Sequence, residues 1–235
     1  MRKDMGKRLR DGITARLEYD FACDRGHSFG EYHLHGVINE IISAIIDPGL
    51  FKLHGGYPHP AINNATGLDE PKRSGRRREV DFYIEHRDTN VARTCIEAKW
   101  GGSSYCTWDR VLLDLYRLAL VKEHCPDSEC LFVLAGPTAE VDAVLESMPS
   151  VWQANYSRQM RALQSPGKKN GVATSRHFRP SGWTVPDLIR ESLPRVPVEI
   201  HTKLAHHTNV KDSKWKTVVW RIEGPPSTGG ETSRT

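Results

Sequence analysis

The sequence lacks any long run of apolar residues. No stretch of its 235 residues approaches the ~20 apolar residues that a membrane-spanning helix needs. The basic segment from Met1 to Arg10 is not followed by an apolar region of the kind found in signal peptides. We therefore expect a cytoplasmic protein without a membrane span.

Cysteine is scarce and irregularly spaced. The five cysteines are odd in number and include no CxxC pair and no zinc-binding framework. Cys95 lies in an apolar run, where a free cysteine packs as a small hydrophobic side chain. His33 and His35 lack cysteine or carboxylate partners at zinc spacing, so a zinc site is not expected there. This cysteine usage favours a reducing compartment.

Charge has no strong excess of one sign. The net charge is +4 and the pI is near 8.8, which is compatible with a polyanionic partner but is equally explained by ordinary solubility. With 38% hydrophobic and 26% charged residues, the composition is that of a soluble globular protein. The length suits one large domain, and no internal repeat is present.

Hydrophobic periodicity predicts alternating helices and strands in the first half of the chain. A helix is expected over Gly30 to Ile46, where apolar residues recur at three-to-four spacing, and a helix over Trp108 to Glu123 follows the same rule. Glu79 to Glu85 and Arg93 to Trp100 predict a hairpin of two strands. The continuous apolar run from Cys130 to Ala135 is typical of a strand buried on both faces.

The remaining segments are less regular. A short helix is expected near Ile13 to Phe21, and a short strand near Leu50 to Leu53 at the start of a long loop over residues 49–77. Further expected elements are helices over 139–148 and 151–163, a surface loop over 165–182, and strands over 196–204 and 216–222.

These elements indicate an α/β protein with one principal domain. We expect an N-terminal extension over residues 1–28, followed by a single domain over 29–223. That domain comprises a core over about 30–136 and a C-terminal elaboration of helices and strands over 137–223. Residues 224–235 are rich in Pro, Gly, Ser and Thr and are expected to form a disordered tail.

The hairpin carries the residues that suggest chemistry. Asp81 lies at the start of its first strand, and Glu97 and Lys99 lie near the end of the second. Side chains two apart on a strand share a face, so Glu97 and Lys99 should point the same way, with Asp81 beside them. Paired carboxylates hold Mg²⁺, which polarises a phosphodiester and activates a bound water. The alternative is an ordinary charged edge on a solvated hairpin.

This pattern resembles the PD-(D/E)xK (restriction-endonuclease-like) nuclease superfamily over about residues 30–136. The resemblance implies a mixed central sheet flanked by helices, with an αβββαβ core. It also implies that Asp81 and Glu97 bind Mg²⁺ and that Lys99 assists catalysis, with the backbone carbonyl of Ala98 as a further ligand. One departure is Val80, which stands where the family name has proline.

A further acid is expected on the first helix of this core, because many members of that family carry one. Glu31 and Glu40 are the candidates, and nine residues at about 100° each place them on opposite sides of the helix. Glu31 falls beside the apolar stripe, together with His35, whereas Glu40 falls on the solvent side. Glu31 is therefore the expected catalytic acid, although a carboxylate in a first helical turn is also favourable by itself.

Other charged residues have weaker assignments. A basic run before Asp81 could contact nucleic-acid phosphates or form a solvated loop. It comprises Lys72, Arg73, Arg76, Arg77 and Arg78. Asp114 and Arg117 could form an intrahelical pair, which is the favoured interpretation, or Arg117 could reach the site.

The sequence thus predicts a nuclease that uses Mg²⁺, with Mn²⁺ able to substitute, and acts on nucleic acid, with DNA the expected substrate. A homodimer is compatible with this prediction. The rival interpretation is a catalytically inactive nucleic-acid-binding or interaction module of the same fold.

Overall fold

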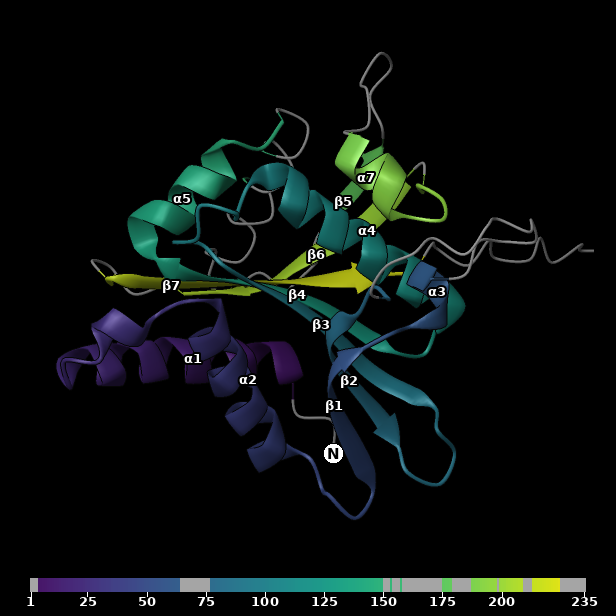
Figure 1. Cartoon of the computed structure of the whole chain (residues 1–235), viewed down its shortest axis with the longest axis horizontal. Helices are drawn as coiled ribbons and strands as arrows, with labels where there is room; N and C mark the ends of the chain where they lie inside the picture. Colours follow the sequence, from purple (N-terminus) through teal and green to yellow (C-terminus); the bar gives the residue numbers. More distant parts are fainter. Residues whose placement is uncertain are drawn as a thin grey trace, which may run out of the picture.

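A seven-stranded mixed sheet forms the centre of the molecule in the computed structural model (Figure 1). The structure describes residues 4–63, 77–149, 153, 157, 175–178, 187–197, 199–208 and 213–224. The helices are α1 (Met5–Ala22), α2 (Glu31–Ile45), α3 (Pro60–Asn63), α4 (Trp108–His124), α5 (Thr138–Glu146) and α7 (Asp187–Ser192), with a short 3-10 helix, η1 (Gly26–Ser28). The strands are β1 (Phe51–Tyr57), β2 (Val80–His86), β3 (Ala92–Trp100), β4 (Glu129–Pro137), β5 (Ser175–Phe178), β6 (Glu199–His207) and β7 (Trp215–Glu223).

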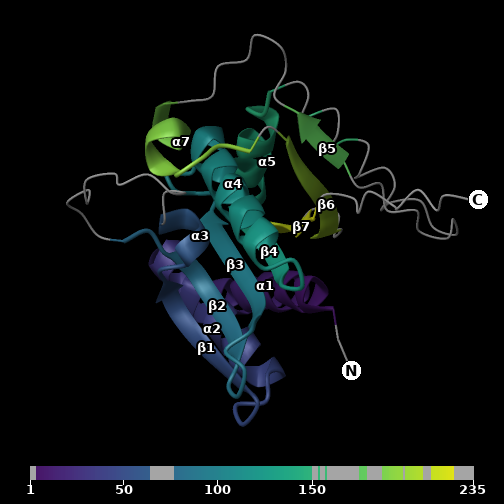
Figure 2. The ribbon, with the colours of Figure 1, turned by 90° about the vertical axis from the view of Figure 1, so that its right-hand side faces the viewer.

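The strand order is β1-β2-β3-β4-β7-β6-β5. β3 and β4 run parallel, and every other neighbouring pair is antiparallel. The parallel connection needs a crossover, which α4 supplies across one face of the sheet. Figure 2 shows β1, β2 and β3 side by side at one side of this sheet. The expected α/β class is confirmed.

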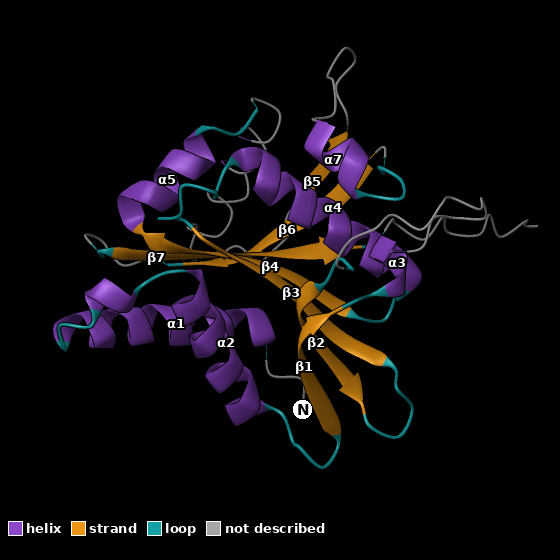
Figure 3. Cartoon of the chain, in the orientation of Figure 1, coloured by secondary structure: helices purple, strands orange, loops and turns teal. Residues whose placement is uncertain are grey.

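Helices cover both faces of the sheet (Figure 3). α1 and α2 pack on one face, and α4 packs on the other with α3, α5 and α7. A hydrophobic core lies on each face of the sheet, and the side chains of β3 alternate between the two. Ile96 and Ala98 face α1 and α2, whereas Cys95 packs on the side of α4. None of the described helices combines the length and the apolar character that a membrane span requires.

The N-terminal segment differs most from expectation. The short helix expected near Ile13 is instead an 18-residue helix, and its Leu9, Ile13 and Leu17 are fully buried against the sheet. Charged residues fill the solvent side of α1 and dilute its apolar signal, while Leu9, Ile13 and Leu17 still recur every four residues. α1 therefore contributes to the core of the domain and is not part of an irregular extension.

The remaining elements follow the expected order with shifted ends. The strand near Leu50 extends through Tyr57, and α3 follows it within the segment expected to be a loop. β5 lies inside the loop expected over 165–182, and α7 was not expected. Most of the helix expected over 151–163, much of that loop, and the tail from residue 225 onward lie outside the described residues.

Candidate active site

Asp81 and Glu97 lie next to each other on adjacent strands. Phe82 pairs with Ile96 and Tyr83 with Cys95, so the antiparallel register brings Asp81 opposite Glu97. Opposed residues in an antiparallel pair point to the same face of the sheet. The hairpin expected from the sequence therefore has the register that its proposed chemistry needs.

The two strands part at this position, and the side chain of Asp81 bridges the gap. Backbone pairing between β2 and β3 extends to Phe82 and Ile96. The next amide along β3, that of Ala98, donates to Oδ2 of Asp81 at 2.8 Å. This hydrogen bond fixes the carboxylate beside Glu97, while the methyl group of Ala98 packs toward α2.

Glu97 is buried, with 1% of its surface exposed. Among the described residues, its Oε1 atom has no hydrogen-bond partner, although a guanidinium nitrogen of Arg117 lies 3.8 Å away. Burial raises the pKa of the Glu97 carboxyl well above its ordinary value, and the charges of Asp114 and Asp81 raise it further. A cation at this carboxylate would offset both effects.

Lys99 connects helices on opposite faces of the sheet. Its Nζ atom lies 3.2 Å from Oε1 of Glu31 on α2 and 3.2 Å from Oδ2 of Asp114 on α4. Burial alone would lower the pKa of Lys99, but the surrounding carboxylates, Asp114 foremost, raise it above the ordinary lysine value. Lys99 is therefore a fully charged ammonium group at neutral pH.

α2 presents Glu31 to the site and Glu40 to solvent, as the helical phase predicts. Glu31 meets Lys99, whereas Glu40 is 62% exposed and pairs with Arg16 on α1. His35 lies one helical turn after Glu31 and places its Nε2 atom 3.6 Å from Oδ2 of Asp81. The sequence placed His35 beside Glu31 but did not assign it to the site, although its i+4 relation to Glu31 is visible in the sequence.

α4 contributes Asp114 and Arg117. The two side chains form the expected i,i+3 pair at 3.0 Å, and Arg117 also approaches Glu97, so the two alternatives left open by the sequence occur together. Asp114 is 1% exposed. Burial raises its pKa, although the charges of Lys99 and Arg117 oppose that rise. A carboxylate inside the apolar stripe of the helix that follows Lys99 is the signal that could have identified it.

The residues present fit a divalent cation. Four carboxyl groups surround two permanent cations, so the cluster would carry a surplus of negative charge with all four ionised. The carboxylates are Glu31, Asp81, Glu97 and Asp114, and the cations are Lys99 and Arg117. No group of three or more His, Cys, Asp or Glu side chains that could by itself hold a metal ion occurs in the part of the chain that the structure describes. Mg²⁺ is commonly bound through only one or two carboxylates, because it keeps several waters.

The basic run before β2 is only partly described. Lys72, Arg73 and Arg76 lie outside the described residues. Arg77 is exposed, whereas Arg78 donates to the carbonyl oxygen of Glu191 at 3.1 Å. The amide of Arg78 also donates to the side chain of Asn63 at 2.9 Å. Arg78 therefore has a structural contact of its own at the entry to β2.

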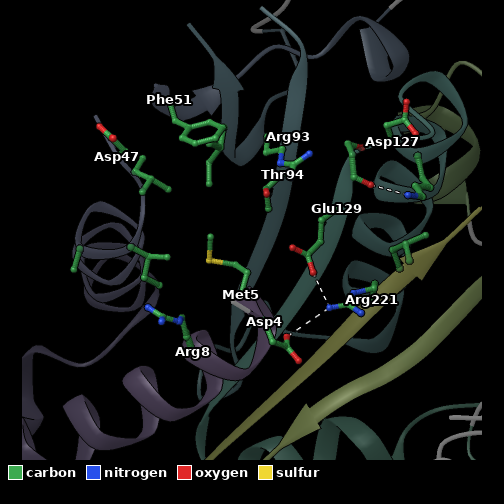
Figure 4. A pocket seen from close by; sticks show the side chains of 17 residues that line it. Asp4, Met5, Arg8, Asp47, Phe51, Arg93, Thr94, Asp127, Glu129 and Arg221 are labelled. Carbon is green, nitrogen blue, oxygen red and sulfur yellow. Dashed lines mark hydrogen bonds and ion pairs between the residues drawn. The ribbon is translucent and has the colours of Figure 1, made fainter. Parts of the chain in front are cut away.

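A cavity of about 820 Å³ lies toward the other end of β3 (Figure 4). Its lining includes Arg93 and Thr94 at the start of that strand, Met5 and Arg8 of α1, and Phe51 of β1. The residues of the carboxylate cluster do not line it.

Comparisons with protein-family models, with curated proteins and with solved structures find no match to this chain.

Proposed function

We propose that the protein is a metal-dependent phosphodiesterase that hydrolyses nucleic acid, with DNA the expected substrate. One observation carries this proposal. The carboxylates of Asp81 and Glu97 lie side by side where β2 and β3 part, and the ammonium of Lys99 is held on the same strand two residues after Glu97.

The order of elements supports the same proposal. Apart from the short helix α3 between β1 and β2, the elements α2, β1, β2, β3, α4 and β4 follow one another as helix, three strands, helix and strand. The parallel pairing of β3 with β4 through α4 sets the strand that bears Glu97 inside the sheet, between β2 and β4. We propose that this core is restriction-endonuclease-like, the arrangement implied by the sequence resemblance.

Asp81 and Glu97 would hold Mg²⁺ or Mn²⁺, with the carbonyl of Ala98 as a further ligand. The bound ion would polarise the scissile phosphate and lower the pKa of a water molecule. Lys99 acts as a hydrogen-bond donor and a positive charge, not as a base, because its raised pKa keeps it protonated at neutral pH. Glu31 holds the Lys99 ammonium from the side of α2.

The rival proposal is a binding module that shares the fold but lacks the chemistry. Oε1 of Glu97 is buried beside a second carboxylate and accepts no hydrogen bond from the described residues, which favours the enzyme, because such an arrangement is costly in a protein that only binds an anion.

Incubation with supercoiled plasmid, linear duplex and RNA, in Mg²⁺, Mn²⁺ or EDTA, tests the proposal. We expect cleavage that needs a divalent ion and that is absent from a Glu97→Gln preparation purified in parallel, which controls for contaminating nucleases. Failure of the parent protein to cut any substrate with either ion, while it still binds nucleic acid, would favour the binding module.

A further inference from the structure

α4 places an ion pair inside the protein at the edge of the carboxylate cluster. Most of the neighbours of Asp114 along the helix are apolar core residues, and its side chain is 2% exposed. Arg117, one turn later, is 19% exposed. A surface pair at this spacing contributes little to stability, and a buried pair is weak evidence for stability by itself. Stability alone therefore does not account for the position of this pair.

Each partner of the pair contacts one of the two polar side chains that β3 presents on this face. Asp114 lies 3.2 Å from Nζ of Lys99, and Arg117 lies 3.8 Å from Oε1 of Glu97. The contacts form an unbroken series of alternating charge. In order, it comprises Glu31, Lys99, Asp114, Arg117 and Glu97.

The two anchors of Lys99 differ in rigidity. Glu31 is 38% exposed and stands in the first turn of α2, where its side chain retains freedom. Asp114 is buried, and Arg117 holds its other oxygen at 3.0 Å. Nζ of Lys99 donates a hydrogen bond to Glu31 and forms an ion pair with Asp114. Since a lysine side chain has a flexible four-carbon stem, we expect the buried partner to restrict its position more than the exposed one.

We propose that Asp114 and Arg117 are positioning residues of this site: Asp114 fixes the ammonium of Lys99, and Arg117 holds Asp114 in register with Glu97. The inference rests on the proposed function, because it assigns the pair to the geometry of the same reaction. Neither residue contacts the phosphate in this scheme.

Asp20 offers a matched control for the loss of a buried carboxylate. It is 1% exposed and pairs with Arg16 at 2.7 Å and Arg25 at 3.3 Å, on a helix that does not contribute to the cluster. Asp114→Asn and Asp20→Asn are isosteric changes that remove one negative charge each, so a general effect of losing a buried ion pair should appear in both.

The experiment compares these variants in single-turnover cleavage, Mn²⁺ calorimetry and NMR relaxation of ¹³C-labelled lysine. The Lys99 signal is assigned by its absence in Lys99→Met. For Asp114→Asn we expect a single-turnover rate lower by about 10- to 100-fold, since a misplacement near 1 Å can cost that much. The nucleic-acid and Mn²⁺ affinities should change far less, and the Lys99 side chain should become mobile. Asp20→Asn should leave rate and mobility unchanged.

Two further variants make the result independent of the folding of Asp114→Asn. Arg117→Gln should increase the mobility of the Lys99 side chain and slow cleavage, as Asp114→Asn does. Arg117→Lys should cut faster than Arg117→Gln, because it keeps the positive charge beside Asp114. A Lys99 side chain that stays as rigid as in the parent, in both Asp114→Asn and Arg117→Gln, would overturn the proposal. If the parent cuts no nucleic acid, the proposed function fails, and the lysine mobility alone then decides whether Asp114 is the anchor.

Discussion

Oδ2 of Asp81 accepts the backbone N–H of Ala98 at 2.8 Å, in the position where β2 and β3 stop pairing through their backbones. The same carboxylate therefore accepts a hydrogen bond from an amide of β3 and also lies beside Glu97 as a proposed metal ligand. Truncation of this side chain would remove both interactions, whereas an isosteric change to an amide can keep the hydrogen bond and remove the charge.

Asp81→Asn should keep the fold and lose the chemistry. The amide oxygen of asparagine can still accept from Ala98, but it lacks the charge that attracts Mg²⁺. We expect no detectable cleavage, weakened Mn²⁺ binding by calorimetry, and DNA binding that survives or tightens because one negative charge facing the phosphates is lost. Asp81→Ala should in addition be less stable by about 1–3 kcal/mol, since the amide of Ala98 loses its acceptor. Equal cleavage by the parent and Asp81→Asn would remove Asp81 from the site.

Lys99→Met should abolish cleavage by a different route. The metal carboxylates stay in place, so Mn²⁺ binding should persist, while the donor to the scissile phosphate is gone. Calorimetry and a plasmid-nicking assay on the same preparation measure the two effects. Loss of metal binding together with cleavage would show that Lys99 supports the carboxylates and does not act on the substrate.

Glu31 and Glu40 form a matched pair on one helix. Glu31→Gln removes a contact to Lys99, so cleavage should slow, whereas Glu40→Gln removes only an exposed pair with Arg16. Both changes should alter the free energy of unfolding by about 1 kcal/mol or less, because Glu40 pairs at the surface and the Glu31 side chain is itself 38% exposed. A slower rate in Glu40→Gln than in Glu31→Gln, measured in one assay, would contradict the assigned helix face.

The faces of their elements on which Glu97, Lys99 and Glu31 lie could be predicted, because periodicity determines them. Strand alternation puts Glu97 and Lys99 on one face, and the helical phase separates Glu31 from Glu40. These rules need no knowledge of tertiary packing.

Contacts between elements distant in the sequence could not be predicted in the same way. The contact of Asp114 with Lys99 depends on how α4 crosses the sheet, which spacing along the chain does not state. The length and burial of α1 could not be predicted, because the many charged residues on its solvent side outweigh three buried leucine and isoleucine residues in the sequence pattern. Cys95 shows the opposite case, since its apolar neighbours indicated the buried position that it takes.

The buried carboxyl of Glu97 should make the metal-free protein less stable as the pH rises. Its pKa is raised in the folded state, so the fold binds this proton more tightly than the unfolded chain does. The stability that this protonated carboxyl contributes is fully present below its pKa in the unfolded chain, about 4.3, and is lost as the pH rises through its pKa in the folded protein. Thermal unfolding in EDTA should show this loss for the parent and a flatter profile for Glu97→Gln. Parallel profiles would contradict the assigned shift.

His59 should give the opposite pH dependence. Burial, together with the charge of His124, lowers the pKa of His59 to about 4. The ring is 2% exposed, and its Nδ1 atom accepts the amide of Ala61 at 3.2 Å, so protonation at this nitrogen would break a hydrogen bond. The folded state therefore disfavours the proton that the unfolded chain takes up.

The sign follows from the lowered pKa. The contribution of neutral His59 to stability is fully present above the pKa of histidine in the unfolded chain, about 6.5. It is lost as the pH falls toward 4, by up to about 3 kcal/mol across that interval. His59→Asn should flatten the acid limb of the unfolding free energy between these values, because asparagine can still accept the amide of Ala61 but does not titrate. His27→Asn, a change at an exposed histidine, is the matched control and should follow the parent. Urea unfolding at a series of pH values measures all three proteins. An acid limb as steep in His59→Asn as in the parent would show that another group causes the loss.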